Sequence, residues 1–271
     1  MPELPEVETV RRGIEPHLLN QQILGAVVRA PKLRYPLDPN LSSKLEGATV
    51  SKVQRRAKYL LIITTTGTLL IHLGMSGTLR FCAHDAPLQK HDHVDILLKE
   101  GNCLRYQDPR RFGLILWTEG PSQDHSLLHG LGPEPLGAEF SGDDLVAHKK
   151  NRRIAIKPFI MDPKVVVGIG NIYAAEALFR AGINPKRSIG RVASFRLHKL
   201  ASTIKEVLKE AVDQGGTTLK DFTNADGDLG YFGQDLAVYG REGLPCPSCK
   251  TNIKRIVLAQ RSTYWCPHCQ K

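Results

Sequence analysis

The first residues of the chain combine a secondary amine with carboxylates. The sequence begins MPELPEVETV, so Pro2 follows the initiator methionine and Glu3 follows Pro2. Removal of the methionine would leave Pro2 with a free α-amino group, whose pKa of about 8 lies below the value of about 10.4 for lysine. Such an amine can form a Schiff base with an electrophilic carbon, and Glu3 could move the proton. Taken alone, these residues leave another interpretation simpler: Met-Pro is a common start, and acidic residues favour a helix N-terminus.

Four cysteines near the C-terminus have the spacing of a zinc site. Cys246 and Cys249 form one CxxC pair, and Cys266 and Cys269 form a second pair after sixteen intervening residues. Each pair supplies two thiolates from one turn, and Zn²⁺ prefers four such ligands in a tetrahedron. Four thiolates leave no ligand position for water, so we expect one structural Zn²⁺ per chain. A redox CxxC pair is the alternative.

The segment between the two cysteine pairs predicts a β-hairpin. Residues 251–265 (TNIKRIVLAQRSTYW) read as two strands that meet near Ala259 and Gln260. Arg261 lies beside this turn, and two further cations lie on the other strand. The hairpin is therefore a candidate contact for DNA as well as a brace for the fold.

A glycine-rich turn precedes a helix that could bind an anion. In PKVVVGIGNIYAAEALFRAGINP (residues 163–185), Gly168 and Gly170 would let the backbone approach a ligand closely. Asn171 is expected to cap the following helix, which Gly182 would end. The N–H groups of a helix N-terminus bind phosphate. The segment predicts a helix–turn–helix variant that grips a DNA backbone, although glycines can also simply make a turn.

The elements that must position these residues change in character along the chain. Pro5 is expected to begin a helix with an apolar side of Val7, Val10, Ile14 and Leu18. Between about residues 22 and 118, short β-branched runs predict a sandwich or barrel. These runs are ILGAVVRA, ATVSKVQ, KYLLIITTT, TLLIHLGM, HVDILL, CLRYQD and GLILWTE. From about residue 142 to 221, apolar residues recur at spacings of three and four, which is typical of helices.

Composition favours a polyanionic partner. The 271 residues carry 37 Lys and Arg against 27 Asp and Glu, a formal net charge of +10. Basic residues cluster in three segments, 149–157, 186–209 and 231–271, a pattern that favours nucleic acid over a merely solvated surface. The acidic, proline-rich N-terminus is unlike a signal peptide, and no apolar run could span a membrane. We therefore expect a cytoplasmic protein, in which Cys82 and Cys103 are buried reduced thiols.

Seven segments occur together and in order: MPELPEVETVRRGIEPHL, QRRAKYLL, HLGMSG, DPRRFG, VVGIGNIYAAEALF, QGGTTLKDF and CPSC…QRST…CPHCQ. Over essentially the whole chain they resemble the bacterial formamidopyrimidine-DNA glycosylase family, enzymes that remove 8-oxoguanine and ring-opened purines. The related endonuclease VIII branch shares the proline, helical and zinc elements. ELPEVE and the RRFG loop favour the formamidopyrimidine branch.

The resemblance implies roles for the catalytic residues. Pro2 attacks C1′ of the damaged nucleotide and displaces the base, and Glu3 is the general acid and base, with support from Glu6. Lys58 holds a phosphate and assists β-elimination. Arg261 clamps the phosphates beside the lesion and takes part in δ-elimination.

The resemblance also implies a set of DNA contacts. Because C1′ is shielded inside a duplex, the nucleotide must be turned out of the stack. Met75, Arg110 and Phe112 are expected to fill the vacancy, although core packing is the ordinary role for the two apolar residues. The remaining implied contacts are His72, His91, Arg153, Asn171 and Tyr239.

Residues 214–222 (QGGTTLKDF) resemble the mobile loop that covers the extruded base. Gly215 and Gly216 would permit closure, and Thr217 and Thr218 would offer hydrogen bonds.

These observations and the resemblance together predict an α+β protein in which an N-terminal helix and a β-sandwich precede a helix–two-turn–helix domain and a C-terminal zinc β-hairpin. The expected domains are residues 1–131 (catalytic), 132–141 (linker), 142–240 (helical) and 241–271 (zinc finger). The predicted function is a bifunctional DNA glycosylase and AP lyase that acts as a monomer on damaged double-stranded DNA in the bacterial cytoplasm. The alternatives are an endonuclease VIII-like enzyme for oxidised pyrimidines and a non-catalytic zinc-dependent DNA-binding protein.

Overall fold

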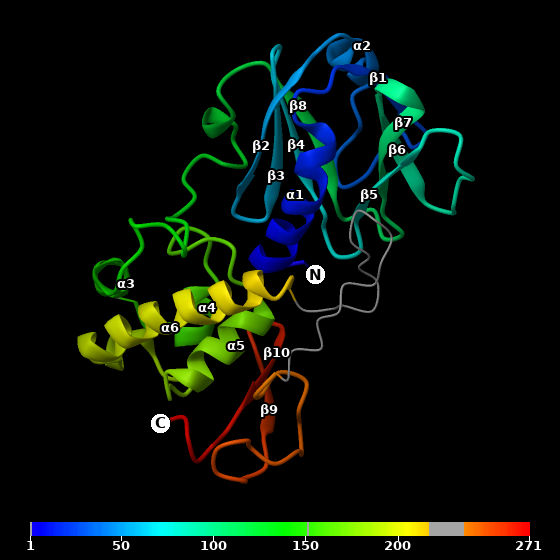
Figure 1. Cartoon of the computed structure of the whole chain (residues 1–271). Helices are drawn as coiled ribbons and strands as arrows, with labels where there is room; N and C mark the ends of the chain where they lie inside the picture. The colour runs from blue at the N-terminus through cyan, green and yellow to red at the C-terminus, as the bar shows by residue number, and fades with distance from the viewer. Residues whose placement is uncertain (1, 151, 217–235) are drawn as a thin grey trace. The chain divides into compact units, whose positions relative to one another are not determined.

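The computed structural model describes residues 2–150, 152–216 and 236–271, which form two compact units. Of the described residues, the first unit contains 2–129 and 215–216, and the second contains 130–150, 152–214 and 236–271. The mixture of helix and sheet confirms the predicted α+β class (Figure 1). No described helix is long and apolar enough to cross a membrane.

The first unit opens with helix α1 (Leu4–Leu18). Pro5 lies in its first turn, where a missing N–H group costs no hydrogen bond. The predicted apolar side is buried and belongs to the main hydrophobic core. Strands β2 and β3 of one sheet and β5 of the other contact α1. The helix is therefore anchored to both sheets, which fixes the place of the N-terminal residues.

Two four-stranded antiparallel sheets form the sandwich (Figure 1). In the first sheet the order is β1 (Ile23–Val28), β6 (Asp92–Leu98), β7 (Asn102–Gln107) and β5 (Thr78–Ala83). In the second the order is β2 (Val50–Arg56), β3 (Tyr59–Thr64), β4 (Thr68–His72) and β8 (Leu114–Thr118). The short helix α2 (Leu41–Leu45) contacts β1. Strand β5 is absent from the seven runs predicted from the sequence.

An ion-pair network crosses the first sheet. Arg105 donates to both oxygens of Asp95, through Nε at 2.8 Å and Nη2 at 2.9 Å, and neither side chain is exposed. Arg29 also pairs with Asp95, at 2.6 Å, and Arg80 on β5 pairs with Asp92 at 2.6 Å. Asp95 lies on β6 beside β7, whereas Asp92 on β6 is one strand further from β5, so each arginine finds its carboxylate within the same sheet. This pairing makes an arginine acceptable inside the strand TLRFCA.

The second unit is helical, as predicted. Its helices are α3 (Gly142–Lys149), α4 (Ile156–Ile160), α5 (Asn171–Arg180) and α6 (Ser194–Asp213). Helix α6 buries the residues that recur at spacings of three and four and packs on α3 and α5. Gly182, with φ of +71°, ends α5 in a left-handed conformation, and the N–H of Ile183 returns to the carbonyl of Leu178.

The predicted hairpin is confirmed as β9 (Lys254–Leu258) and β10 (Arg261–Trp265). The two turn residues, Ala259 and Gln260, have φ of +46° and +61°. Two-residue turns with positive φ at both positions match the twist of a hairpin and usually contain glycine. Arg261 follows this turn directly, and β10 packs on α5.

Candidate active site

Pro2 and Glu3 lie where the chain enters α1. Both are buried, and Glu3 is the residue that precedes the first helical residue. The Glu6 carboxylate accepts the backbone N–H of Glu3 at 2.7 Å, which fixes the direction of the chain at this point. Processing of Met1 would therefore place a secondary amine beside two buried carboxyl groups.

Lys58 lies on the two-residue turn between β2 and β3, and an ion pair ties this turn to α1. Arg55 bonds to the Glu8 carboxylate at 3.2 Å and donates from Nη1 to the carbonyl of Ala57 at 2.9 Å. Burial would raise the pKa of Glu8, but the hydrogen bond and charge of Arg11, the charge of Arg55 and the hydrogen bond of Arg12 outweigh it and lower that pKa. Glu8 is thus an anion that holds the Lys58 turn against the first turns of α1.

His72, at the end of β4, is a neutral hydrogen-bond donor. Its ring meets the ring of Tyr59 edge to face at 4.9 Å, and its Nδ1 accepts the N–H of Gly74 at 2.9 Å. Burial and the charges of Lys58 and Arg34 lower the pKa of His72 to about 4. Because Nδ1 is an acceptor in the neutral ring, the proton is on Nε2.

Met75 and Phe112 are surface residues. Their exposed fractions are 40% and 48%, which excludes the alternative of core packing for both. They line a pocket in the first unit together with Arg34, His72 and Gly74. Apolar side chains held in this way at a surface are suited to insertion between bases. The Arg110 guanidinium carbon lies 4.8 Å from the centre of the Phe112 ring.

Asp108 joins the loop that carries Met75 (residues 73–77, the Met75 loop) to the loop that carries Phe112 (residues 108–113, the Phe112 loop). One carboxylate oxygen accepts from the Ser76 hydroxyl at 2.7 Å and from the N–H of Arg110 at 3.2 Å. The other accepts from the N–H of Gly113 at 2.8 Å and from the Tyr106 hydroxyl at 3.2 Å. Asp108 is fully buried, and it fixes both loops through three of these hydrogen bonds, while the fourth ties it to Tyr106 on β7.

Two further predicted residues lie beside these elements. The His91 backbone has φ of +76°, and its carbonyl accepts the N–H of Asp108 at 3.1 Å. Gly216 has φ of +85° and packs against Glu6, where an added Cβ atom would come within 3.2 Å of backbone atoms. Gly215 also has positive φ. Thr217 and Thr218 lie outside the described residues.

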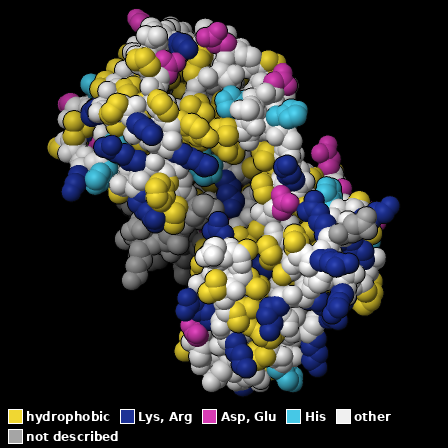
Figure 2. Space-filling view, turned by 180° about the vertical axis from the view of Figure 1, so that it is seen from behind, with side chains coloured by type: hydrophobic (Ala, Val, Ile, Leu, Met, Phe, Trp, Pro, Cys, Tyr) yellow, Lys and Arg dark blue, Asp and Glu magenta, His cyan; other side chains and the backbone are white. Residues whose placement is uncertain are grey.

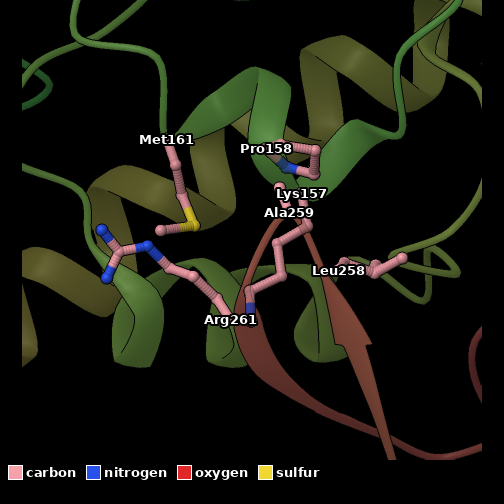
Figure 3. A pocket seen from close by; sticks show the side chains of 6 residues that line it. All are labelled: Lys157, Pro158, Met161, Leu258, Ala259 and Arg261. Atoms are coloured by element: carbon pink, nitrogen blue, oxygen red, sulfur yellow. The ribbon is translucent and has the colours of Figure 1, made fainter.

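In the second unit, a buried lysine organises Asn171 and the hairpin. Lys157 is 1% exposed, and its Nζ donates to Asn171 Oδ1 at 2.7 Å and to Thr263 Oγ1 at 3.0 Å. Asn171 Nδ2 donates to the carbonyl of Ser262 at 3.0 Å. From the hairpin turn the Arg261 side chain extends beside Met161, whereas Lys157 reaches down from α4 (Figure 3).

The expectation that Asn171 caps α5 is wrong. The preceding residue, Gly170, occupies the cap position, and Asn171 is the first helical residue. Its side chain is not available to the backbone of its own helix because Lys157 and Ser262 hold both ends of the amide.

Tyr239 is held by a carboxylate on α5. Glu176, 5% exposed, accepts the backbone N–H groups of Ala237, Val238 and Tyr239 at 2.9 to 3.0 Å. The Tyr239 ring packs edge to face on Tyr264 of β10 at 5.2 Å. Glu176 therefore sets where Tyr239 meets the hairpin.

The four cysteines of the C-terminal pairs converge as predicted. Their sulfur atoms all lie within 4.8 Å of one another, with separations of 3.9 Å for Cys246–Cys269 and 3.4 Å for Cys249–Cys266. Tetrahedral zinc with Zn–S bonds of about 2.3 Å requires sulfur atoms about 3.8 Å apart. The four sulfur atoms fit one Zn²⁺, which would join the two CxxC pairs. No ligand position on the ion would remain for substrate.

Basic side chains are frequent on one face of the molecule. Lys and Arg gather on the face drawn in Figure 2, with few acidic side chains among them. Arg153, a predicted DNA contact, is exposed. A surface of this kind attracts a polyanion and makes its binding depend on salt.

Sequence reasoning missed three residues that organise the site: Asp108, Lys157 and Glu176. Glu176 had a usable signal, because it is the one acid in the apolar helical stretch NIYAAEALF and so had to find a buried partner. Asp108 precedes a proline, as turn-forming aspartates often do. Lys157 ends a run of basic residues, and the lysines of such a run are usually exposed to solvent.

Family models match three ranges of the chain. Residues 1–115 match the formamidopyrimidine-DNA glycosylase N-terminal domain, residues 131–223 match the H2TH domain of the same enzymes, and residues 243–271 match a zinc finger found in FPG and IleRS. The formamidopyrimidine-DNA glycosylase of Thioalkalivibrio sulfidiphilus is 56% identical over 271 residues, and that of Syntrophotalea carbinolica is 55% identical. Both alignments cover the full length of both chains.

Solved structures agree with these relatives. The MutM (Fpg) protein from Thermus thermophilus superposes with a TM-score of 0.88 at 39% identity, covering 99% of this chain and 98% of that one. A complex of Lactococcus lactis Fpg with DNA containing an abasic site gives 0.91 at 33% identity, covering 99% of each chain. A complex of the same wild-type protein with DNA containing N7-benzyl-Fapy-dG also gives 0.91 at 33% identity and covers both chains completely.

Proposed function

The chain belongs to the formamidopyrimidine-DNA glycosylase family, and we propose on that premise how its residues divide the reaction. The protein is a DNA repair enzyme with glycosylase and AP lyase activities, acts on damaged DNA and carries one structural zinc ion. Its full-length relatives are named as formamidopyrimidine-DNA glycosylases, which favours oxidised purines over the pyrimidines of the endonuclease VIII alternative.

Base excision begins at the N-terminal amine. The Pro2 nitrogen attacks C1′, the glycosidic bond breaks, and the electron pair leaves with the damaged base. The attacking amine loses its proton and the departing base gains one. Glu3 delivers a proton to the ring oxygen O4′, so the sugar opens and a C1′ iminium remains on Pro2. The observation that carries this proposal is the buried start of α1, where Pro2 adjoins Glu3 and Glu6 orders the Glu3 backbone.

Strand cleavage follows from the iminium, which makes the C2′ proton acidic. Loss of that proton expels the 3′ phosphate by β-elimination. Lys58 and the Nε2–H of His72 would hold a phosphate, because one is a cation and the other a neutral donor close to it. Arg261, exposed beside the hairpin turn, would clamp the phosphates and assist δ-elimination.

The remaining residues bind DNA and keep the nucleotide extruded. Met75, Arg110 and Phe112 would occupy the vacated space, supported by their exposure on loops that Asp108 joins. The implied backbone and phosphate contacts are His91, Arg153, Asn171 and Tyr239. Gly215 and Gly216 would begin the loop over the lesion.

We further propose the domain limits 1–131, 132–141, 142–240 and 241–271 for the catalytic, linker, helical and zinc-finger parts. A DNA substrate places the enzyme with the chromosome in the bacterial cytoplasm, where it would act as a monomer.

Borohydride trapping tests the nucleophile. Protein shown by mass spectrometry to have lost Met1 is reduced in the presence of an 8-oxoguanine:cytosine duplex, and the adduct is mapped by peptide sequencing. An adduct on Pro2 is expected, and an adduct on Lys58 would refute this assignment while leaving a lyase. Glu3→Gln serves as the matched variant. It should trap on a preformed abasic site, whose sugar opens to an aldehyde without the enzyme, but not on 8-oxoguanine.

A lesion panel separates the substrate classes. Faster excision of oxidised pyrimidines than of 8-oxoguanine or formamidopyrimidines would favour the endonuclease VIII-like alternative. Absence of both trapping and nicking with every lesion would favour the non-catalytic alternative.

A further inference from the structure

Two cysteines outside the zinc cluster face each other across adjacent strands. Cys82 on β5 is the register partner of Cys103 on β7, and their Sγ atoms are 3.7 Å apart. A disulfide requires sulfur atoms about 2.05 Å apart, so closure needs an approach of about 1.6 Å. The zinc cluster uses the other four of the six cysteines, and the proposed reaction uses neither Cys82 nor Cys103.

The strand that carries Cys82 has room to make this movement. In the order β1-β6-β7-β5, strand β5 is at the edge of its sheet, and among the described strands it pairs with β7 alone. A strand paired on one side moves with the loss of fewer backbone hydrogen bonds than a central strand. Closure is therefore expected to displace β5 toward β7.

The two thiols differ in access. Cys82 is half-buried, whereas Cys103 is fully buried. Burial and the neighbouring Asp95 carboxylate raise the pKa of Cys103 to about 12, so Cys103 reacts slowly with a dissolved oxidant and must lose its proton as it attacks Cys82. A small oxidant in solution would thus meet Cys82 first, with Cys103 directly behind it as a resolving thiol.

We propose that Cys82 and Cys103 form a reversible peroxide-sensitive dithiol that closes to a cross-strand disulfide. In the first step the Cys82 sulfur attacks hydrogen peroxide, and Cys82 becomes a sulfenic acid as one water leaves. In the second step the Cys103 sulfur attacks the Cys82 sulfur, the S–O bond breaks, and the thiol proton leaves with the hydroxyl group as a second water. Peroxide is reduced and the two thiols are oxidised.

The disulfide would act on the loops described above. Strand β5 starts at Thr78, directly after the Met75 loop, and β7 ends at Gln107, directly before the Phe112 loop. The cysteine pair lies four residues from these strand ends, so a displacement of β5 against β7 would reach the two loops along the paired strands. The effect on the loops rests on the proposed function. The formation of the disulfide does not.

The test uses the zinc-loaded full chain. It is exposed to hydrogen peroxide, unfolded in the presence of an alkylating agent, digested and analysed by mass spectrometry. The expected product is a peptide pair linked through Cys82 and Cys103, separated by dithiothreitol, while the zinc cysteines are recovered alkylated. In the same samples, nicking of an 8-oxoguanine duplex should fall in proportion to the cross-linked fraction and recover on reduction.

Cys82→Ser and Cys103→Ser are the matched variants, and each should form no link and keep its nicking rate in peroxide. Recovery of both thiols unmodified, or of Cys82 as a sulfinic acid without a link, would overturn the proposal. A link that forms only after zinc is lost would overturn it too. A link that leaves nicking unchanged would refute its effect on the loops, independently of whether Pro2 is the nucleophile.

Discussion

Replacement of Asp108 by Asn should loosen the Met75 and Phe112 loops together. The carboxylate offers two oxygens, each of which accepts from one hydroxyl and one backbone N–H. An asparagine amide replaces one oxygen with a donor. The Ser76 and Tyr106 hydroxyls can rotate to accept from that donor, but a backbone N–H cannot. One N–H, of either Arg110 or Gly113, therefore loses its bond to residue 108 in any orientation of the amide.

The cheaper orientation turns the amide nitrogen toward Ser76. Arg110 then keeps only its 3.2 Å bond to the Ser76 hydroxyl, and Gly113 keeps its acceptor. One charge-assisted bond of about 2 kcal/mol is lost, and the three that remain become neutral bonds of about 1 kcal/mol each. Removal of a buried charge offsets part of this loss. We expect a net decrease of about 2 kcal/mol in the free energy of unfolding.

Urea unfolding measures this loss, and single-turnover nicking of an 8-oxoguanine duplex measures the consequence for the loops. If disorder of the two loops raises the free energy of the transition state by about 1.4 kcal/mol, nicking slows about tenfold. Binding of undamaged duplex should change little because it depends on phosphate contacts. Ser76→Ala, which removes one donor and leaves the carboxylate, should have a smaller effect. An Asp108→Asn protein with the wild-type urea midpoint and nicking rate would refute the reasoning.

Three further outcomes are expected. Glu176→Gln weakens the acceptor of three backbone N–H groups, so the free energy of unfolding should fall by about 1–2 kcal/mol; an unchanged melting temperature would contradict this. The pKa of His72 is lower in the folded state than in the unfolded chain, so protonation favours the unfolded chain below about pH 6.5. The free energy of unfolding should therefore fall by about 2–3 kcal/mol as the pH decreases from about 6.5 toward 4. His72→Gln should flatten this part of the urea-midpoint profile, and parallel profiles would count against the neutral ring. Chelation of zinc should abolish duplex binding and nicking together, with recovery on adding Zn²⁺; retained binding by protein shown to be metal-free would exclude a structural ion.

Local patterns in the sequence were sufficient for part of the fold. The zinc ligands occur in two CxxC pairs, and the hairpin turn lies between two short strands, so a few neighbouring residues carry the signal. The apolar side of α1 follows from the helical period. Exposure of Met75 and Phe112 could not be derived in this way, since an apolar residue is more often buried.

Long-range pairing explains what the sequence did not predict. The ammonium of Lys157 bonds to a residue 106 positions away, and Glu176 binds backbone groups more than 60 positions away. Such partners leave no periodicity around either residue. The cap at Gly170 was missed for the same reason, because the amide of Asn171 is used by Lys157 and the hairpin. The same holds for Arg80, whose distant partner makes an arginine acceptable in β5.

The buried pair of Arg105 and Asp95 restricts which substitutions related sequences can accept at these two positions. Both side chains are fully enclosed. Loss of Asp95 takes the main partner from the buried Arg105 at a cost of about 3–5 kcal/mol, whereas loss of Arg105 leaves Asp95 its ion pair with Arg29. Two apolar residues in place of the pair can be equally stable. Replacement of Arg105 before Asp95 is therefore the less costly order of change. Aligned descendants that lack Asp95 should also lack Arg105, with Arg29 released from its role whenever they do.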